Sequence, residues 1–349
     1  MATIHTVQRG ESLSVIATRY GFRNWRTIYD HPSNAAFRKK RPNPNLIGAG
    51  DQIVIPEKVT KQVTASTGQT HTYQASSAKQ RVEFLLGVYD LLNPSEPIPT
   101  LTVKLRLPGG QEKELKTDSS GEIKLSEPEI TAGQVDVLDI RDEKDPAVIR
   151  YLKYAKTGLA TNQSNQLLVP DKRKIIDRIA SIHKVQRRRV WGSKTPSYTA
   201  MDEDWDYTTV VIHHSGNSGE KEPKEIERKH MDENGWDDVG YHYLIKPDGT
   251  IFEGRHLAYK GSHVEKANSQ KIGILIMGDF EHQWWDGDDD PTATQISAAE
   301  ALIKTLKSEI GTVTKLGGHR DYKPGTECPG GEMYGRLGGF RAATGLGGP

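Results

Sequence analysis

The stretch TTVVIHHSG, residues 208–216, is a run of apolar and β-branched residues that ends in two histidines. It shows no alternation of apolar and polar residues, which is typical of a strand buried on both faces. KIGILIMGDF, residues 271–280, is a second continuous apolar run. Strands of this kind lie inside a sheet whose two faces are covered, so the sequence favours a fold that layers helices on a sheet.

Helical and hairpin patterns alternate with these two strands along the last part of the chain. EPKEIERKHMDENG, residues 222–235, predicts a helix that ends at Gly235. YHYLIKPDGTIFEGR, residues 241–255, predicts two strands around a Pro-Asp-Gly turn. Residues 292–311 predict a long helix with an apolar stripe, again ended by a glycine. We therefore expect residues 158–349 to form an α/β domain with a mixed central sheet and flanking helices.

The two histidines that end the first strand are candidate metal ligands. Adjacent residues of a strand point to opposite faces, so His213 and His214 cannot easily bind one ion together. The alternation does not say which of the two faces a site. Further along, GGHRDYKPGTECPGG (residues 317–331) contains His319 and Cys328, the only cysteine of the chain. Two imidazoles and one thiolate are sufficient protein ligands for a catalytic Zn²⁺ that keeps an open position for water.

Composition and charge exclude several kinds of partner. The 349 residues carry a formal net charge of +1, so no global basic field indicates nucleic acid. No apolar run approaches the ~20 residues that span a bilayer, and membrane insertion is not expected. The N-terminus, MATIHTVQRGESLSV, lacks the basic and apolar regions of a secretory signal peptide. A single cysteine excludes an intrachain disulfide, as expected of a protein synthesised in the cytoplasm.

The middle of the chain predicts a polar linker followed by short strands. Residues 58–81 are rich in Thr, Ser and Gln, which predicts a linker. Residues 82–157 contain short β-type runs separated by turn signals such as NPSEPIP, PGG and DSSG. This spacing predicts a small β-sandwich-like domain, and it contains no catalytic constellation, so we expect a spacer. TGLATNQSNQ, residues 157–166, is predicted to be a loop.

The first 57 residues predict a small multi-element unit of their own, which makes the chain multi-domain. HTVQRGESLSVIATRYG, residues 5–21, reads as a strand, a turn and a helix with Ser12 as its N-cap. NPNLIGAGDQIVIP, residues 43–56, is a turn-rich loop that leads into a strand. At these stretches residues 1–57 resemble a LysM module, a βααβ unit that binds N-acetylglucosamine-containing glycans such as peptidoglycan and chitin. The resemblance implies a glycan groove that includes Ser12, Leu13, Asn45 and Ile47.

The last part of the chain resembles another family at several stretches, in the family's order and spacing. These stretches are RRVWG, VVIHHSG, HMDENGWDDVGYHYLIKPDGTIFEGR, GSHVEKANSQKIGILIMGDF and GGHRDYKPGTECPG. Residues 187–340 are similar to the zinc-dependent N-acetylmuramoyl-L-alanine amidases of type 2, which share a fold with peptidoglycan-recognition proteins. The resemblance implies that Zn²⁺ is held by His213, His319 and Cys328. His214 then falls on the opposite face of the strand.

The same resemblance implies further site residues. Tyr241 ends the GWxDxGY pattern, and Thr326 lies two residues before the cysteine. Both are expected to hydrogen-bond the developing oxyanion or the metal-bound water. His263, in GSHVEKANS, corresponds to a family histidine near the substrate cleft and is a candidate substrate-binding residue. An ordinary packing or turn role is the competing interpretation for Tyr241 and Thr326.

These observations predict a peptidoglycan hydrolase. It would use zinc-activated water to cleave the amide bond between N-acetylmuramic acid and the L-alanine of the stem peptide. The N-terminal module would hold the enzyme near its polymer. Without a signal peptide, such a protein would reach the cell wall after lysis or by non-classical export, as a bacteriolytic endolysin or a secreted effector.

Two other interpretations belong to different classes of protein. One is a peptidoglycan-binding protein without activity, and the other is a structural protein of a phage-tail-like or injection apparatus. Recognition relatives of this fold often lack the cysteine ligand, so the complete set of His213, His319 and Cys328 favours the enzyme.

Overall fold

The contacts of the chain divide it into two compact units. The computed structural model describes residues 3–8, 11–58, 82–144, 147–151, 156–282 and 289–349. The first unit comprises Met1–Asp142 and Tyr151–Asp171, and the second comprises Glu143–Arg150 and Lys172–Pro349. Apart from residue 58, the predicted linker lies outside the described residues.

The N-terminal part of the first unit pairs its first and last strands around short helices. Its elements are β1 (Thr3–Thr6), α1 (Leu13–Arg19), α2 (Arg26–Tyr29), η1 (Pro32–Asn34), α3 (Ala35–Lys40) and β2 (Gln52–Ile55). β1 and β2 are antiparallel. The Ser12 hydroxyl accepts a hydrogen bond from the Val15 amide at 3.3 Å, so Ser12 caps α1 as predicted. The sequence predicted the order strand, helix, helix, strand. The structure has two further elements, η1 and α3, between the second helix and the last strand.

The rest of the first unit is built from strands. They are β3 (Glu83–Asp90), β4 (Thr102–Arg106), β5 (Glu112–Lys116), β6 (Glu122–Ser126), β7 (Gln134–Asp142), β9 (Lys156–Ala160) and β10 (Ser164–Val169). One sheet has the order β10-β3-β6. In the other, β4 lies between β5 and β7, and β9 also pairs with β7. The strands β3 to β7 lie in the region where the sequence predicted short β-type runs.

The prediction of a loop at residues 157–166 is wrong. These residues form most of β9 and the start of β10, and residues 151–171 belong to the first unit. β10 lies parallel to β3, with Leu168 opposite Tyr89, and β9 lies antiparallel to β7. Because these pairings join segments far apart in the chain, the polar local sequence gave no sign of them.

The second unit contains a mixed sheet, as predicted from the alternation of strands and helices. Its strand order is β13-β12-β14-β11-β15. β11 is parallel to both of its neighbours, β14 and β15, and β13 is antiparallel to β12. The strands are β11 (Thr209–His214), β12 (Tyr243–Ile245), β13 (Ile251–Glu253), β14 (Lys271–Ile276) and β15 (Lys315–Gly318), and the two-residue strand β8 (Ile149–Arg150) also belongs to this unit.

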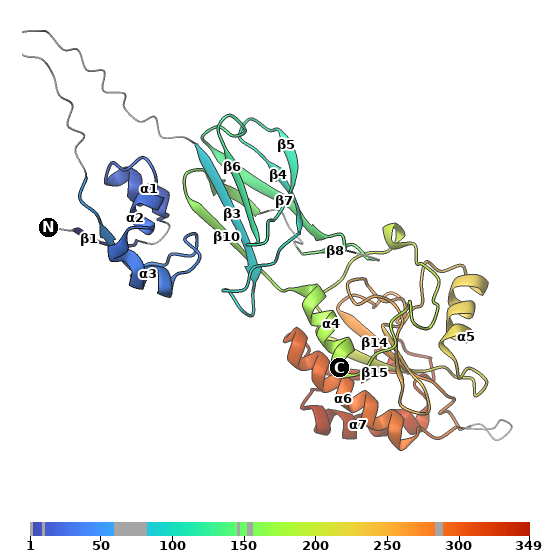
Figure 1. Cartoon of the computed structure of the whole chain (residues 1–349). Helices are drawn as coiled ribbons and strands as arrows, with labels where there is room; N and C mark the ends of the chain where they lie inside the picture. The colour runs from blue at the N-terminus through green and yellow to red at the C-terminus, as the bar shows by residue number, and fades with distance from the viewer. Residues whose placement is uncertain (1–2, 9–10, 59–81, 145–146, 152–155, 283–288) are drawn as a thin grey trace, which may run out of the picture. The chain divides into compact units, whose positions relative to one another are not determined.

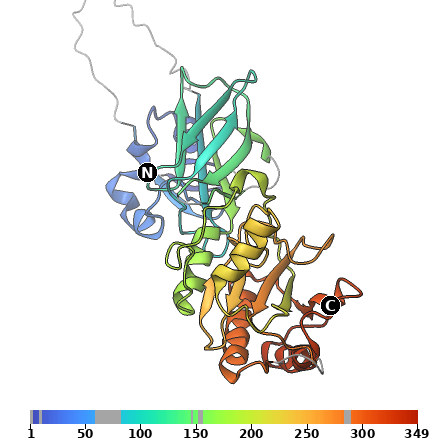
Figure 2. The same ribbon diagram turned by 90° about the vertical axis from the view of Figure 1, so that its right-hand side faces the viewer.

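Helices cover the sheet of the second unit on both faces. α6 packs on β12 and β14, and α7 packs on β15 and α6. Figure 1 shows α4, α6 and α7 on one side of the sheet and α5 on the other, and α5 faces the viewer in Figure 2. The helical elements are α4 (Lys172–Ile182), η2 (Tyr198–Ala200), α5 (Pro223–Glu227), the π-helical turn η3 (Arg228–Glu233), α6 (Ala293–Ile310), η4 (His319–Asp321) and α7 (Gly331–Thr344).

The helices that the sequence predicted at residues 222–235 and 292–311 both occur, the first as α5 followed by η3. Thr292 caps α6, and Gly311 ends it in the left-handed conformation with φ 77°. Among the described residues, none of the helices has both the length and the apolar character that a membrane crossing requires.

Candidate metal centre

The inner strand β11 places the two adjacent histidines on opposite faces of the sheet. Every residue of β11 is buried, and His213 is fully inaccessible. His213 lies beside Leu275 of β14, whose side chain packs with Ile226 of α5. His214 instead packs its ring against Phe280, and its Nδ1 accepts a hydrogen bond from the Phe280 amide at 3.2 Å. The strand alternation that the sequence analysis used is therefore present.

A loop after the neighbouring strand β15 carries the other two candidate ligands. β15 runs directly into η4, which begins at His319. The Asp321 carboxylate accepts hydrogen bonds from the Gly318 amide at 2.7 Å and from the Tyr334 hydroxyl at 2.6 Å. The Arg320 amide donates to the Cys328 carbonyl at 3.0 Å, which closes the loop. Asp321 was missed by the sequence analysis, although an acidic residue three positions after Gly318 is a known helix-start signal.

His213, His319 and Cys328 converge in the structure. Each offers one nitrogen or sulfur atom, and these atoms lie within 4.8 Å of one another. Cys328 Sγ is 3.5 Å from His213 Nδ1, and the rings of His213 and His319 have centroids 4.7 Å apart. The three side chains come from β11 and from the loop after β15, which are adjacent because β11 and β15 pair in the sheet.

The chemistry of these three donors fits a metal ion such as zinc. Burial lowers the pKa of His213 well below its usual value and lowers the pKa of His319 to about 4, so both imidazoles are neutral at pH 7. His319 Nε2 is buried and has no hydrogen-bond partner within the part of the chain that the structure describes. Burial raises the pKa of the Cys328 thiol to about 12. A cation would reverse that shift, because a coordinating thiol is deprotonated by its metal.

Tyr241 lies against the same cluster. Its ring centroid is 5.0 Å from that of His213 and 5.5 Å from that of His230. Burial, and then the charge of Cys328, raise the pKa of Tyr241 well above its usual range. The hydroxyl is therefore protonated at neutral pH and can donate a hydrogen bond.

Thr326 is close in sequence to Cys328, and its side chain contacts the backbone of that residue. Its hydroxyl oxygen accepts a hydrogen bond from the Cys328 amide at 3.3 Å, and the side chain is half-buried. This contact supports the turn interpretation of Thr326. Its predicted part in catalysis stays a prediction.

His263 lies behind His213. It is buried, with 6% of its surface exposed, and its Nδ1 is 2.9 Å from His213 Nε2. Sequence analysis predicted a substrate-binding residue here and did not anticipate this contact. A ring that is enclosed in this way is poorly placed to reach a substrate, and its observed partner is a candidate metal ligand.

The four residues of the predicted glycan groove have different environments in the structure. Ser12 caps α1. The backbone amide of Asn45 donates a hydrogen bond to Asn43 Oδ1 at 3.0 Å. Ile47 is half-buried and packs against the core of the N-terminal part. Leu13 is 2% exposed in that core, so its side chain is not available to a glycan. Glycan binding by the groove of Ser12, Leu13, Asn45 and Ile47 stays a prediction.

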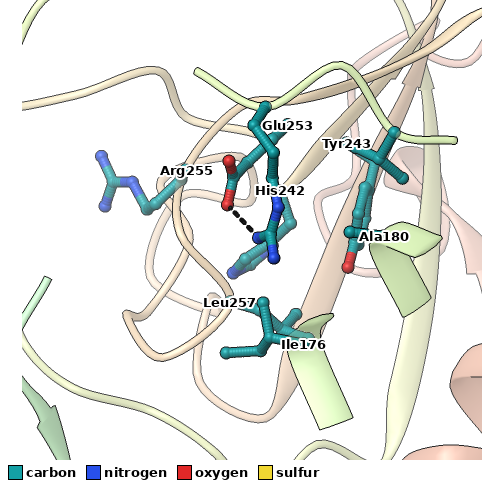
Figure 3. Close-up of a pocket in the computed structure, with 9 residues that line it drawn as sticks. Ile176, Ala180, His242, Tyr243, Glu253, Arg255 and Leu257 are labelled. Atoms are coloured by element: carbon teal, nitrogen blue, oxygen red, sulfur yellow. Dashed lines mark hydrogen bonds and ion pairs between the residues drawn. The ribbon is translucent and has the colours of Figure 1, made fainter. Parts of the chain in front are cut away.

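A small cavity lies elsewhere in the second unit (Figure 3). Ile176 of α4 and Leu257 line it together with the polar side chains of His242, Glu253 and Arg255. The three converging donor residues are not among its lining residues, so this cavity is separate from the candidate metal centre. The described residues also include a second group, His282, Asp290 and Glu332, whose donor atoms lie close together. His282 and Asp290 are exposed and none of the three is buried.

Comparisons with known proteins found similar sequences for part of the second unit. A family model described as N-acetylmuramoyl-L-alanine amidase matches residues 204–331. Peptidoglycan-recognition protein LB of Drosophila melanogaster is 32% identical over 161 residues, which are 43% of this chain and 66% of that relative. Peptidoglycan-recognition protein SC2 of Drosophila simulans is 34% identical over 157 residues, 42% of this chain and 80% of that relative.

Among solved structures, the N-acetylmuramoyl-L-alanine amidase LysC from Clostridium intestinale is 27% identical, and the match covers 42% of this chain and 93% of that one with a TM-score of 0.37. The sequence matches define the class as one of peptidoglycan-related proteins. The chain belongs to the family of N-acetylmuramoyl-L-alanine amidases and peptidoglycan-recognition proteins.

Proposed function

We propose that this protein is a zinc-dependent N-acetylmuramoyl-L-alanine amidase. The observation that carries the proposal is the convergence of His213, His319 and Cys328, whose donor atoms lie within 4.8 Å of one another at the end of the buried strand β11. Its substrate would be the amide bond that joins N-acetylmuramic acid to the L-alanine of the peptidoglycan stem peptide. The family membership supports this choice of substrate class.

The three converging residues would hold the zinc. Two neutral imidazoles and one thiolate form a set of three protein ligands, which is the number that catalytic zinc sites use. Zinc bound there would polarise the scissile carbonyl and activate a water molecule. The buried β11 and the Asp321 hydrogen bonds hold the ligands in place before an ion arrives, so little ordering is required on binding.

Tyr241 would act on the reacting carbonyl. Its hydroxyl is protonated at neutral pH, since burial raises its pKa. A protonated phenol beside the ligand cluster can donate a hydrogen bond to the negative charge that develops on the carbonyl oxygen of the substrate. This interaction strengthens as the charge develops, so it lowers the activation barrier more than it strengthens substrate binding.

The N-terminal elements from β1 to β2 would serve as a glycan-binding tether. The LysM resemblance of residues 1–57 supports this role. Tethering raises the local concentration of peptidoglycan around the catalytic site without contacting the scissile bond. Delivery to the cell wall by lysis, or through a tail-like or secretion apparatus, stays a prediction.

The proposal is tested by digestion of purified peptidoglycan. We expect the zinc-loaded protein to release stem peptides that begin with a free L-alanine amine, identified by mass spectrometry. Cys328→Ser should abolish both this release and stoichiometric zinc, because a neutral hydroxyl replaces the thiolate ligand. His282→Ala is the matched control, since it removes the exposed histidine of the second group and should leave zinc content and release unchanged.

A peptidoglycan-binding role without catalysis is the second candidate, because the names of the matched relatives describe recognition proteins. In the same digestion, tight binding to peptidoglycan with the stem linkage intact would favour this candidate. Wild-type protein that contains no zinc after loading would also overturn the amidase proposal.

A further inference from the structure

His263 contacts His213 on the side of the ring that faces away from the other two donors. His213 Nε2 lies 2.9 Å from His263 Nδ1, whereas His213 Nδ1 lies 3.5 Å from Cys328 Sγ. The second nitrogen of His263, Nε2, is 3.3 Å from the carbonyl oxygen of Lys271. These three contacts form a chain from a backbone carbonyl, through His263 and His213, to the ligand cluster.

The His263 ring is held in one position by its surroundings. The amides of His263 and Val264 both donate to Asn268 Oδ1, at 2.8 and 2.6 Å. A Cβ atom on Gly273 would lie 2.6 Å from two atoms of the ring, and a Cβ on Gly261 would be closer still. Glycine at both positions therefore makes room for the ring between two stretches of backbone. The ring is therefore enclosed at the position where it contacts His213.

The Lys271 carbonyl determines which nitrogen of His263 carries the proton. A carbonyl oxygen only accepts hydrogen bonds, so His263 Nε2 must be the protonated nitrogen and donate to it. In a neutral imidazole the other nitrogen is then an acceptor. His263 Nδ1 therefore accepts from His213, which requires the proton of His213 to be on Nε2. His213 Nδ1 is left with a free lone pair directed toward Cys328.

The opposite assignment of protons is unfavourable at both ends of this series of hydrogen bonds. With the proton on His263 Nδ1, the lone pair of Nε2 would face the lone pairs of the Lys271 carbonyl in a buried site. His213 would then accept at Nε2 and carry its own proton on Nδ1, the nitrogen nearest to Cys328. A protonated nitrogen cannot bind a metal, so this arrangement would block the candidate centre.

We propose that His263 is a positioning residue that fixes the tautomer of His213, so that His213 offers Nδ1 as the metal-binding atom. The zinc part of this inference rests on the proposed function, whereas the tautomer is a property of the metal-free protein. Partners of this kind, which lie behind a metal ligand, typically contribute about 10–100-fold to metal affinity.

The first test reads the tautomer directly in the metal-free wild-type protein. We expect long-range ¹H–¹⁵N spectra of histidine-labelled protein at neutral pH to show the proton of His213 on Nε2 and the proton of His263 also on Nε2. A proton on His213 Nδ1 would overturn the proposal. This measurement needs no variant, so it is decisive even if substitutions at position 263 prevent folding.

The second test measures Zn²⁺ affinity by competition with a chromophoric chelator. His263→Leu removes the acceptor and should weaken zinc binding by about 10–100-fold. His263→Asn places a carbonyl oxygen near the position of Nδ1 and should recover most of that affinity. His256→Leu is the matched control, because His256 is as buried as His263 and its Nδ1 accepts a hydrogen bond from the Ala258 amide.

The outcomes separate the two proposals. Wild-type affinity in His263→Leu, or an equal loss in His256→Leu, would overturn the positioning role. Wild-type protein that binds zinc in the chelator competition but releases no stem peptide would count against the amidase and leave the positioning role intact. Wild-type protein that binds no zinc would overturn the zinc part of both, and the tautomer would still be decided by the spectra.

Discussion

Tyr241 combines a half-buried side chain with a hydroxyl that keeps its proton, and its ring centroid lies 5.0 Å from that of His213. Tyr241→Phe keeps the ring and removes the hydrogen-bond donor. We expect kcat for peptidoglycan cleavage to fall by about 10²–10³-fold, the usual loss when one donor to an oxyanion is removed. Zinc content and KM should change little, because the phenyl ring still packs on His213. Steady-state kinetics and metal analysis of the same preparation measure both.

A Tyr241→Phe variant that loses its zinc would show instead that the tyrosine supports the ligand cluster. An unchanged kcat would show that another group stabilises the oxyanion. Thr326→Ala is a useful comparison, since the observed contact of Thr326 is with the Cys328 amide.

At the scale of single residues, the sequence could nominate ligands but not their surroundings. His213, His319 and Cys328 could be nominated because metal ligands are restricted to a few residue types. Strand alternation put His213 and His214 on opposite faces, and the family resemblance then favoured His213. The contact between His263 and His213 depends on how a loop folds over the sheet, and local sequence carries little information on that. The burial of Leu13 follows from its helical spacing with Ile16 and Ala17, which places its side chain in the core.

Between α3 and β2, a buried carboxylate connects two elements of the N-terminal part. Asp51 is 2% exposed and accepts hydrogen bonds from Lys40 Nζ, Arg41 Nε and the Gly48 amide, each at 2.8 Å. Burial raises the pKa of Asp51, but the hydrogen bonds from Arg41 and Lys40 outweigh it and lower the pKa to about 2. The ionised carboxylate therefore stabilises the folded state.

This lowered pKa predicts how the stability of the N-terminal part depends on pH. The folded pKa is below the ordinary value of 3.8, so the stabilisation is complete above about pH 4 and is lost as pH falls toward 2. We expect a loss of about 1–2 kcal/mol over that range, reduced by the solvent exposure of Lys40 and Arg41. Urea unfolding of the full chain, followed through NMR signals of residues 3–58, measures it.

Asp51→Asn is the control for that measurement. The variant should be less stable than the wild type at pH 7, and its stability should depend less on pH between 4 and 2, because it has no carboxylate to protonate at this position. The same pH dependence in both proteins would show that other carboxyl groups cause the effect.

At the scale of elements, prediction succeeded where the local pattern and the tertiary contacts agreed. The apolar runs of β11 and β14 and the capped helix α6 are examples. α7 was not predicted, because Gly331, Gly335, Gly338 and Gly339 give its sequence a low helix propensity. It forms because Met333, Leu337 and Phe340 are buried on one side of it. β9 and β10 were also missed, since their sequences are polar and β10 pairs with β3, which is distant in the chain.

For the whole molecule, the proposed tether and the proposed catalytic unit predict a dependence on the physical state of the substrate. Removal of residues 1–58 should reduce the rate on insoluble peptidoglycan by up to about 10²-fold, because the local concentration of glycan falls. Cleavage of a soluble muropeptide should be unchanged, since the candidate metal centre lies entirely in the second unit. Parallel assays of the full chain and the truncated protein measure the ratio of the two rates.

An equal reduction of the cleavage rate on both substrates would show that residues 1–58 affect the catalytic unit itself and do not act by binding glycan. Equal rates of the full and truncated proteins on insoluble peptidoglycan would remove the tether from the proposed function. The family match to residues 204–331 concerns only the second unit. The experiment therefore tests the role of residues 1–58, for which the LysM resemblance is the main support.

The pairing of β11 with β15 has a consequence for the order of events during folding. The two strands are more than a hundred residues apart in the chain, and each leads to part of the donor set. The set is therefore incomplete until this non-local pairing has formed, which is slow compared with helix formation. Stoichiometric metal uptake by refolding protein would thus report the completion of the sheet, and a fragment that ends before β15 would fail to take up the ion however well its other strands had formed.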